Sequence, residues 1–264
     1  MIAADRFRHW ARQLGHQGPL ITGHRGDPRH ELENTLPSLC AAAGMRVAVE
    51  MDVRLSADQV PVVFHDARLS RLVDDPRAVG EVPWSELALL TLRRSDHPGR
   101  SGRIPRLSEV VAAISPDIPL FVEIKCEGGG HAAQAVVAAA MTVLGDRRAD
   151  SYAVMSFNPW VVMALRRRFP RVLRGYLYET YAHVVLPTWQ KWLLRQRVLG
   201  PWMRPDFWGP NVELVHAHQV ERDRRRGRAT VVWTADSDAE RNRVRAAGAD
   251  VLITNDPETA LAML

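Results

Sequence analysis

Cysteine is scarce in this sequence, lysine is almost absent, and long apolar runs are missing. The two cysteines among 264 residues, Cys40 and Cys126, lie far apart and lack the close spacing of a metal-binding pair. We therefore expect free thiols, and neither a disulfide-stapled scaffold nor a cysteine-based metal site. No stretch approaches the roughly 18 to 20 apolar residues of a membrane-spanning helix. The N-terminal segment carries charges where a signal peptide needs an apolar centre, so we expect a cytoplasmic protein.

The shortage of lysine changes how the charge of the chain is interpreted. The net charge is +5 and the pI about 9.7, which suits a nucleic acid, an anionic lipid surface or an anionic small substrate. Arginine supplies nearly all of the positive charge, since lysine occurs only at Lys125 and Lys191. Arginine in place of lysine throughout the chain is a compositional bias, and the pI alone therefore indicates no particular partner.

Short apolar segments alternate with predicted helices along most of the chain. This alternation predicts an α/β fold with a parallel sheet and a sizeable core. We favour a TIM-type (β/α)8 barrel, formed by a single domain over 1–264, and not a doubly wound open sheet. The reason is that chemistry-bearing residues follow nearly every strand, and the active site of a barrel forms at those strand ends. The predicted strands cover 20–22, 47–55, 60–64, 120–125, 153–157, 172–178, 207–209, 230–234 and 251–254.

Two regions depart from the regular alternation. The gap between Asp52 and His65 is too short for a crossover helix, so an irregular strand–turn–strand region is expected near 50–65. Residues 181–205 interrupt the later rhythm with tryptophans and arginines, and we expect a small helical or loop insertion there.

Three carboxylates stand near the ends of two predicted strands. Glu50 and Asp52 are two positions apart and therefore point to one side of a strand, where their like charges repel unless a cation lies between them. Glu123 ends another strand, with Lys125 on the same face. An all-oxygen donor set suits Mg²⁺ or Ca²⁺ and not zinc. The sequence therefore predicts a divalent-metal site, and the neighbouring lysine indicates an anionic substrate.

Two histidines, His24 and His65, also follow apolar strands, and they suit a general acid and a general base. Phosphodiester cleavage needs such a pair together with cations that neutralise the phosphoryl oxygens, a task that fits Arg25 and Lys125. Each position alone has an ordinary structural explanation, such as a hydrogen-bonding histidine or a surface ion pair. That charged residues follow four strands for four unrelated structural reasons is the weaker explanation. We therefore interpret the set as one active site.

Short motifs occur in a fixed order over nearly the whole chain. They are HRG at 24–26, ENT at 33–35, EMDV at 50–53, VVFHD at 62–66, IPRLSE at 104–109, EIK at 123–125, SFN at 156–158, VWT at 232–234 and ITNDP at 253–257. This series resembles the glycerophosphodiester phosphodiesterases. Two positions depart from the family pattern: Gln59 stands where a turn glycine is usual, and Asn255 intervenes before Asp256. Neither is a predicted catalytic position, so active chemistry is expected and substrate choice stays open.

The resemblance implies a TIM-type barrel that hydrolyses glycerophosphodiesters to an alcohol and glycerol 3-phosphate with a divalent metal, Mg²⁺ or Ca²⁺. It leaves open which histidine is the acid. It implies His24 and His65 as the acid–base pair and Glu50, Asp52 and Glu123 as metal ligands. It also implies that Arg25 and Lys125 contact the phosphate and that Phe157 and Trp233 line the pocket.

Three functions stay open from the sequence. The main hypothesis is a diesterase that acts on small soluble substrates such as glycerophosphocholine. An alternative is a lysophospholipase D-type enzyme at a membrane surface, because the tryptophans and arginines of 186–208 suit a lipid interface, although a helical cap on the barrel rim explains them more simply. The third is a non-catalytic nucleic-acid binder, suggested by the pI and the basic run 222–226. That run is expected to end a helix, and we expect no nucleic-acid partner.

Overall fold

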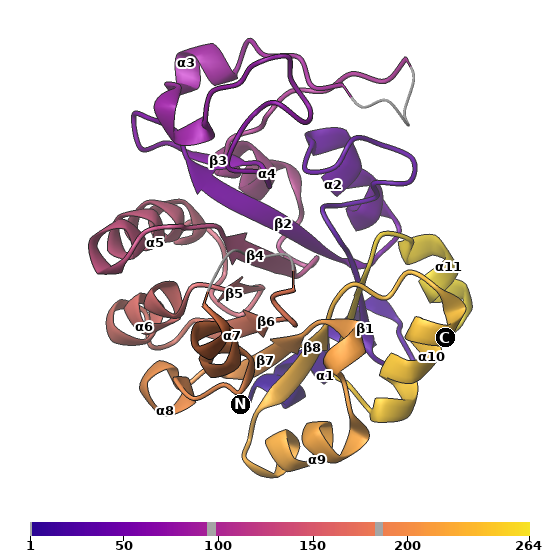
Figure 1. The fold of residues 1–264 in the computed structure, drawn as a ribbon. Helices are drawn as coiled ribbons and strands as arrows, with labels where there is room; N and C mark the ends of the chain where they lie inside the picture. Colours follow the sequence, from indigo (N-terminus) through magenta and orange to yellow (C-terminus); the bar gives the residue numbers. More distant parts are fainter. Residues whose placement is uncertain (1, 94–98, 183–186) are drawn as a thin grey trace.

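The computed structural model describes residues 2–93, 99–182 and 187–264. Within these residues, eight parallel strands close into a barrel, because β1 pairs with both β2 and β9 (Figure 1). The predicted TIM-type (β/α)8 fold is confirmed. In order around the barrel the strands are β1 (Leu20–Gly23), β2 (Ala48–Leu55), β4 (Leu120–Ile124), β5 (Tyr152–Ser156), β6 (Leu173–Tyr178), β7 (Phe207–Pro210), β8 (Ala229–Val232) and β9 (Val251–Thr254).

Helices surround the barrel and connect most of its strands (Figure 1). Several begin where the sequence supplies a capping side chain: Thr35, Asn158 and Ser237 each accept a hydrogen bond from a backbone N–H in the first turn. The described helices are α1 (Ala3–Leu14), α2 (Leu36–Gly44), α3 (Trp84–Leu87), α4 (Leu107–Ala113), α5 (Gly130–Leu144), α6 (Pro159–Arg168), α7 (Thr188–Arg195), α8 (Gly200–Met203), α9 (Ala217–Arg225), α10 (Asp238–Ala247) and α11 (Pro257–Ala262), with 3₁₀ turns at Val79–Glu81 and Val212–Leu214.

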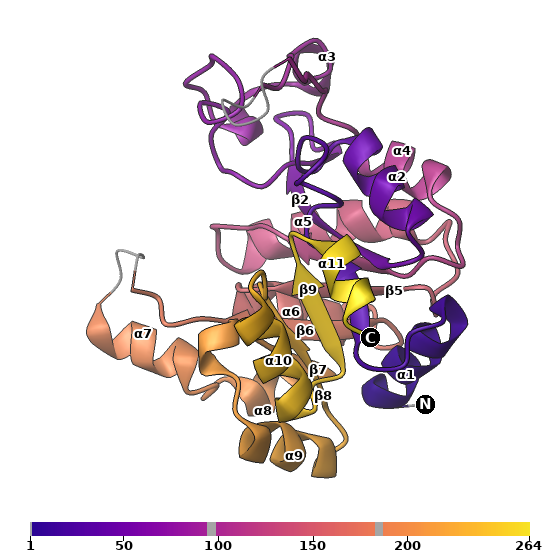
Figure 2. The ribbon, with the colours of Figure 1, turned by 90° about the vertical axis from the view of Figure 1, so that its right-hand side faces the viewer.

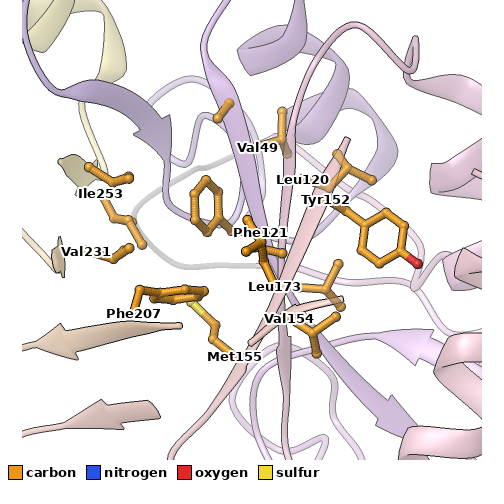
Figure 3. Close-up of a cluster of buried hydrophobic side chains, with 14 of the residues drawn as sticks. Val49, Leu120, Phe121, Tyr152, Val154, Met155, Leu173, Phe207, Val231 and Ile253 are labelled. Atoms are coloured by element: carbon orange, nitrogen blue, oxygen red, sulfur yellow. The ribbon is translucent and has the colours of Figure 1, made fainter. Parts of the chain in front are cut away.

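Aromatic rings fill the amino-terminal end of the barrel, and α1 covers them. The Phe7 ring of α1 lies 5.4 Å from the ring centroids of both Phe121 and Phe207. Figure 3 shows Phe121 and Phe207 between the strands, with Met155 beside them. Gly175 on β6 leaves room for this packing, since a Cβ there would lie 2.0 Å from the Phe207 ring. With this end filled by apolar groups, the polar strand ends gather at the opposite, carboxyl-terminal end.

The irregular region near 50–65 is a hairpin, as the short spacing predicted. Strand β3 (Pro61–Val63) runs antiparallel to β2, with Val53 opposite Val63. Gln59 adopts a positive φ of 63° in the connecting turn, the conformation that a glycine usually supplies. The hairpin returns the chain to the end of β2, where the Phe64 N–H donates to the carbonyl of Asp52 at 2.9 Å. His65 is thereby placed at the carboxyl-terminal end of the barrel.

The expected insertion near 181–205 is confirmed as helical, with α7 and α8 lying between β6 and β7. In Figure 2, α7 projects from the barrel on the side opposite α1. It therefore lies at the carboxyl-terminal end of the barrel. In the parts of the chain that the structure describes, no helix combines the length and apolar character needed to span a bilayer. Cys40 and Cys126 are free thiols, as expected.

Candidate active site

Three carboxylates meet inside the carboxyl-terminal end of the barrel. Glu50 and Asp52 lie on β2, and Glu123 on β4 is the register partner of Asp52. One carboxylate oxygen of each lies within 4.8 Å of those of the other two. The three residues are only 1%, 1% and 6% exposed. Period-two alternation places Glu50 and Asp52 on one face, and the strand register adds Glu123.

The turns after β1 hold two of these carboxylates in place. The backbone N–H of Arg25 donates to Glu50 Oε2 at 2.9 Å, and Asn34 Nδ2 donates to Asp52 Oδ2 at 2.8 Å. Arg25 and Asn34 both adopt a positive φ, 57° and 58° respectively. This conformation costs a non-glycine residue on the order of 1 kcal/mol or more. The strained backbone at these two residues therefore directs the Arg25 N–H and the Asn34 side-chain amide toward the carboxylates.

The carboxylates are too close and too buried to stay ionised without additional positive charge. Burial and the charges of Asp52 and Glu123 raise the pKa of Glu50 well above its ordinary value. Burial also disfavours ionised Asp52, but Lys125 and Arg25 outweigh it and lower the pKa of Asp52. Among the described residues, Asp52 Oδ1 and Glu123 Oε1 each form an ion pair with Lys125, and neither oxygen has a well-formed hydrogen bond. Buried, under-used oxygen donors of this kind fit a divalent cation.

Two cations border the carboxylates. Lys125 Nζ lies 3.1 Å from Asp52 Oδ1 and 2.6 Å from Glu123 Oε1. Arg25 Nε lies 3.2 Å from Asp52 Oδ2, and Arg25 Nη1 lies 2.8 Å from Glu33 Oε1. Burial opposes the charge on Lys125, but the two carboxylates outweigh it and raise the pKa of Lys125. Both side chains therefore stay cationic beside the carboxylates.

His65 is held by a chain of charged side chains. Its Nδ1 lies 2.6 Å from Asp66 Oδ1, and the other oxygen of Asp66 accepts a hydrogen bond from Arg71. Arg71 also donates to Glu33, which binds Arg25. Since an ionised carboxylate only accepts hydrogen bonds, His65 Nδ1 carries a proton and Nε2 is left for chemistry.

His24 is held by a residue that directly follows β9. β1 and β9 are neighbours, so His24 Nδ1 lies 2.7 Å from Oδ1 of Asn255, a residue 231 positions later. Burial, followed by the charge of Arg25, lowers the pKa of His24 to about 4. His24 is therefore neutral near pH 7, with Nδ1 as the protonated nitrogen and Nε2 free to accept a proton.

Phe157 and Trp233 form an aromatic wall beside the cations. Their ring centroids are 5.2 Å apart in an edge-to-face arrangement, and Lys125 Nζ lies 5.7 Å from the Phe157 centroid. The indole N–H of Trp233 donates to the carbonyl of Gly209 at 2.9 Å, which fixes the ring. The structure thus places the two aromatics expected to line the pocket against each other and next to the charged centre.

Several supporting residues were not among the predicted site residues. Glu33, Asn34 and Asp66 belong to the ENT and VVFHD motifs, which marked their positions without indicating their contacts. Asn255 was visible only as a departure from the family pattern. Asp236, which binds Asn255, had no signal in the sequence.

The charged groups surround one centre, since Lys125, Arg25 and the protonated forms of His65 and His24 all act to lower the pKa of Asp52. The arrangement combines one neutral imidazole, a second imidazole paired with a carboxylate, two cations and a carboxylate triad. Such a site can bind an anion, neutralise its oxygens and move protons at two positions.

Known proteins share this arrangement of sequence and fold. A model of the glycerophosphoryl diester phosphodiesterase family matches residues 24–259. The chain is 26% identical over 248 residues to the glycerophosphodiester phosphodiesterase of Caldanaerobacter subterraneus subsp. tengcongensis, covering 93% of this chain and 97% of that protein. It superimposes with a TM-score of 0.77 on an Oleispira antarctica phosphodiesterase in complex with the product sn-glycerol-3-phosphate, at 25% identity over 92% of this chain and 96% of that one. For the glycerophosphodiester phosphodiesterase of Thermotoga maritima the TM-score is 0.69, at 26% identity over 94% of this chain and 100% of that one.

Proposed function

The chain belongs to the glycerophosphoryl diester phosphodiesterase family and is a phosphodiesterase, and we propose that it hydrolyses glycerophosphodiesters to an alcohol and glycerol 3-phosphate as a single catalytic domain. The buried triad of Glu50, Asp52 and Glu123 carries this proposal, because it would hold Mg²⁺ or Ca²⁺ beside two cations and two histidines. When bound, the metal would polarise a phosphoryl oxygen. Because the family is enzymatic, we set aside the non-catalytic nucleic-acid binder.

In this mechanism His24 is the general base and His65 the general acid. Burial and Arg25 lower the pKa of His24 to about 4, so its free Nε2 can take the proton of the attacking hydroxyl or water. His65 contacts Asp66 through Nδ1, and this carboxylate holds the ring with Nε2 left for proton transfer. A proton on His65 Nε2 is then available for the leaving alkoxide.

The remaining predicted residues bind and enclose the substrate. Arg25 and Lys125 retain N–H groups beyond their carboxylate contacts, and these would bind phosphoryl oxygens. Phe157 and Trp233 offer an apolar wall for the carbon skeleton of the substrate and limit access of water to it.

The test measures glycerol 3-phosphate release from a panel of glycerophosphodiesters by the full chain. We expect turnover to cease in EDTA and to return with Mg²⁺ or Ca²⁺. His24→Ala and His65→Ala should each lose about 10²- to 10⁴-fold in kcat. The exposed histidine of α9 provides a matched control, and His218→Ala should behave as wild type. Undiminished turnover in EDTA, or full activity of either catalytic variant, contradicts the proposal.

A diester with an aryl leaving group separates the two histidines. An aryloxide departs without protonation, so the loss in His65→Ala should shrink to a few-fold on this substrate while His24→Ala stays impaired. The opposite pattern would exchange the two assignments.

A second candidate function is a lysophospholipase D-type activity at an anionic membrane surface. Trp189 and Trp192 on α7 are 62% and 58% exposed, and no residue of α7 is buried. The helix lies at the carboxyl-terminal end of the barrel, which also holds the site (Figure 2). Residues 180–205 contain no aspartate or glutamate, while Lys191 and Arg195 add positive charge to the helix. Tryptophan with basic residues suits the interface of an anionic bilayer.

Sedimentation with vesicles tests this candidate. Wild type should bind phosphatidylcholine vesicles that contain phosphatidylglycerol and a lysophospholipid at low salt, and it should release the headgroup of the lysophospholipid. The double variant Trp189→Ala, Trp192→Ala should lose binding while its activity on soluble diesters is unchanged. Leu89→Ala is the control, because Leu89 is 74% exposed and lies outside 186–208. Failure of wild type to bind at low salt removes this candidate.

A further inference from the structure

A second layer of side chains determines how Asn255 faces His24. Asn255 Nδ2 donates to Asp236 Oδ2 at 2.7 Å, and the backbone N–H of Asn255 donates to Asp236 Oδ1 at 2.8 Å. The hydroxyl of Thr254 donates to the same Oδ1 at 3.1 Å. The carboxylate thus accepts three hydrogen bonds from two adjacent residues at the end of β9.

The backbone of Asp236 is held by the start of α10. The backbone N–H of Asp236 donates to Glu240 Oε2 at 3.0 Å, and Glu240 also forms the capping box of the helix with Ser237. The segment after β8 is therefore anchored on one side by a capped helix and on the other by β9. An exposed aspartate held in this way has a fixed direction toward Asn255.

Because a carboxylate accepts and cannot donate, the amide of Asn255 has one allowed orientation. Its NH₂ group must face Asp236, and its oxygen must face His24. That oxygen in turn requires a hydrogen on His24 Nδ1. We infer that Asp236 and Asn255 are positioning residues, which fix the Nδ1–H tautomer of His24 and keep Nε2 as the proton acceptor. The inference rests on the proposed role of His24 as the base.

The substitution Asp236→Asn tests the inference, because it reverses the direction of the hydrogen bonds that run from His24 through Asn255 to position 236. The new amide oxygen would accept from the Asn255 backbone and Thr254, which leaves its NH₂ group facing the Asn255 side chain. The Asn255 amide would then turn its own NH₂ toward His24 and favour the Nε2–H tautomer. We expect kcat to fall about 10- to 100-fold, with KM little changed.

The chain supplies a matched control and a rescue. Asp238→Asn makes the same chemical change two positions away, at a side chain that is 74% exposed and pairs with Arg241, and it should leave kcat unchanged. In the double variant Asp236→Asn, Asn255→Asp, the carboxylate at position 255 accepts from His24 Nδ1 and from the amide NH₂ group at position 236. The kcat should therefore recover most of the loss. A role limited to loop stability predicts no such recovery.

Nitrogen NMR of His24 reads the tautomer directly in the full-length protein. Wild type should show a protonated Nδ1, and Asp236→Asn a protonated Nε2. An Nε2–H tautomer in wild type, or an undiminished kcat in Asp236→Asn, overturns the inference. Failure of the proposed base role appears separately, as full activity of His24→Ala while the tautomer of wild type stays as expected.

Discussion

Removing the charge of Lys125 should make the stability of this protein depend on the metal. The ammonium group lies 3.1 Å from Asp52 and 2.6 Å from Glu123, with its side chain only 14% exposed. Lys125→Met keeps the apolar stem of the side chain and deletes the charge. Two buried carboxylates then lose their nearest cation, and a bound divalent ion becomes their main remaining source of positive charge.

The contact distances give the size of the effect. At an effective dielectric constant of about 20, each contact of Lys125 corresponds to roughly 5 to 6 kcal/mol of Coulomb energy. Burying the ammonium costs several kcal/mol, and Glu123 can take up a proton when its partner is gone. We therefore expect a net loss of about 3 kcal/mol in the free energy of unfolding without metal. For a protein of this size that corresponds to a decrease in Tm of about 6 to 12 °C.

Thermal unfolding in EDTA and in excess Mg²⁺ or Ca²⁺ measures this dependence. The deficit of Lys125→Met should be large in EDTA and should shrink by more than half with the metal, because the ion stabilises the variant more than wild type. Lys191 is the second lysine of the chain and lies partly exposed on α7, so Lys191→Met should match wild type in both conditions. An equal deficit with and without metal would refute the reasoning.

Two further predictions concern pH and packing. The folded pKa of His24 is about 4 and its ordinary value 6.5, so the folded state binds fewer protons and loses stability, up to about 3 kcal/mol, as pH falls from 6.5 to 4. Denaturant titrations over this range should show a shallower decline for His24→Gln, and equal slopes would contradict the assignment. Gly175→Ala pushes a methyl group into Phe207 and should cost about 1 to 3 kcal/mol of unfolding free energy, whereas Gly44→Ala, which meets no atom within 4 Å, should cost nothing.

Local patterns in the sequence are sufficient to predict much of the barrel and of its carboxylate cluster. Apolar strands that end in charge identified Glu50, Asp52 and Glu123, because alternation along a strand is a property of neighbouring residues. The spacing between Asp52 and His65 predicted the hairpin, because it leaves too few residues for a crossover helix. Gln59 shows the limit of local rules, since its turn forms in the left-handed conformation without the glycine that the family pattern expects.

Contacts across the barrel could not be predicted in this way. Asp52 faces Glu123 because β2 and β4 are paired in one particular register, and Asn255 meets His24 because barrel closure makes β1 and β9 neighbours. Glu33 links Arg25 to the chain that holds His65 through loops whose paths depend on the whole fold. Strand order and register are collective results of packing, and residues far apart in sequence carry no local sign of them.

By itself, then, the sequence determined which polar and charged side chains stand at the strand ends and which end of the barrel they occupy. The tertiary structure alone decided their protonation and orientation. The pKa of His24 is low because the fold buries the ring beside Arg25, and its tautomer is fixed because Asp236 turns the amide of Asn255 toward it. Both effects depend on distances between groups that the chain brings together only when the barrel closes.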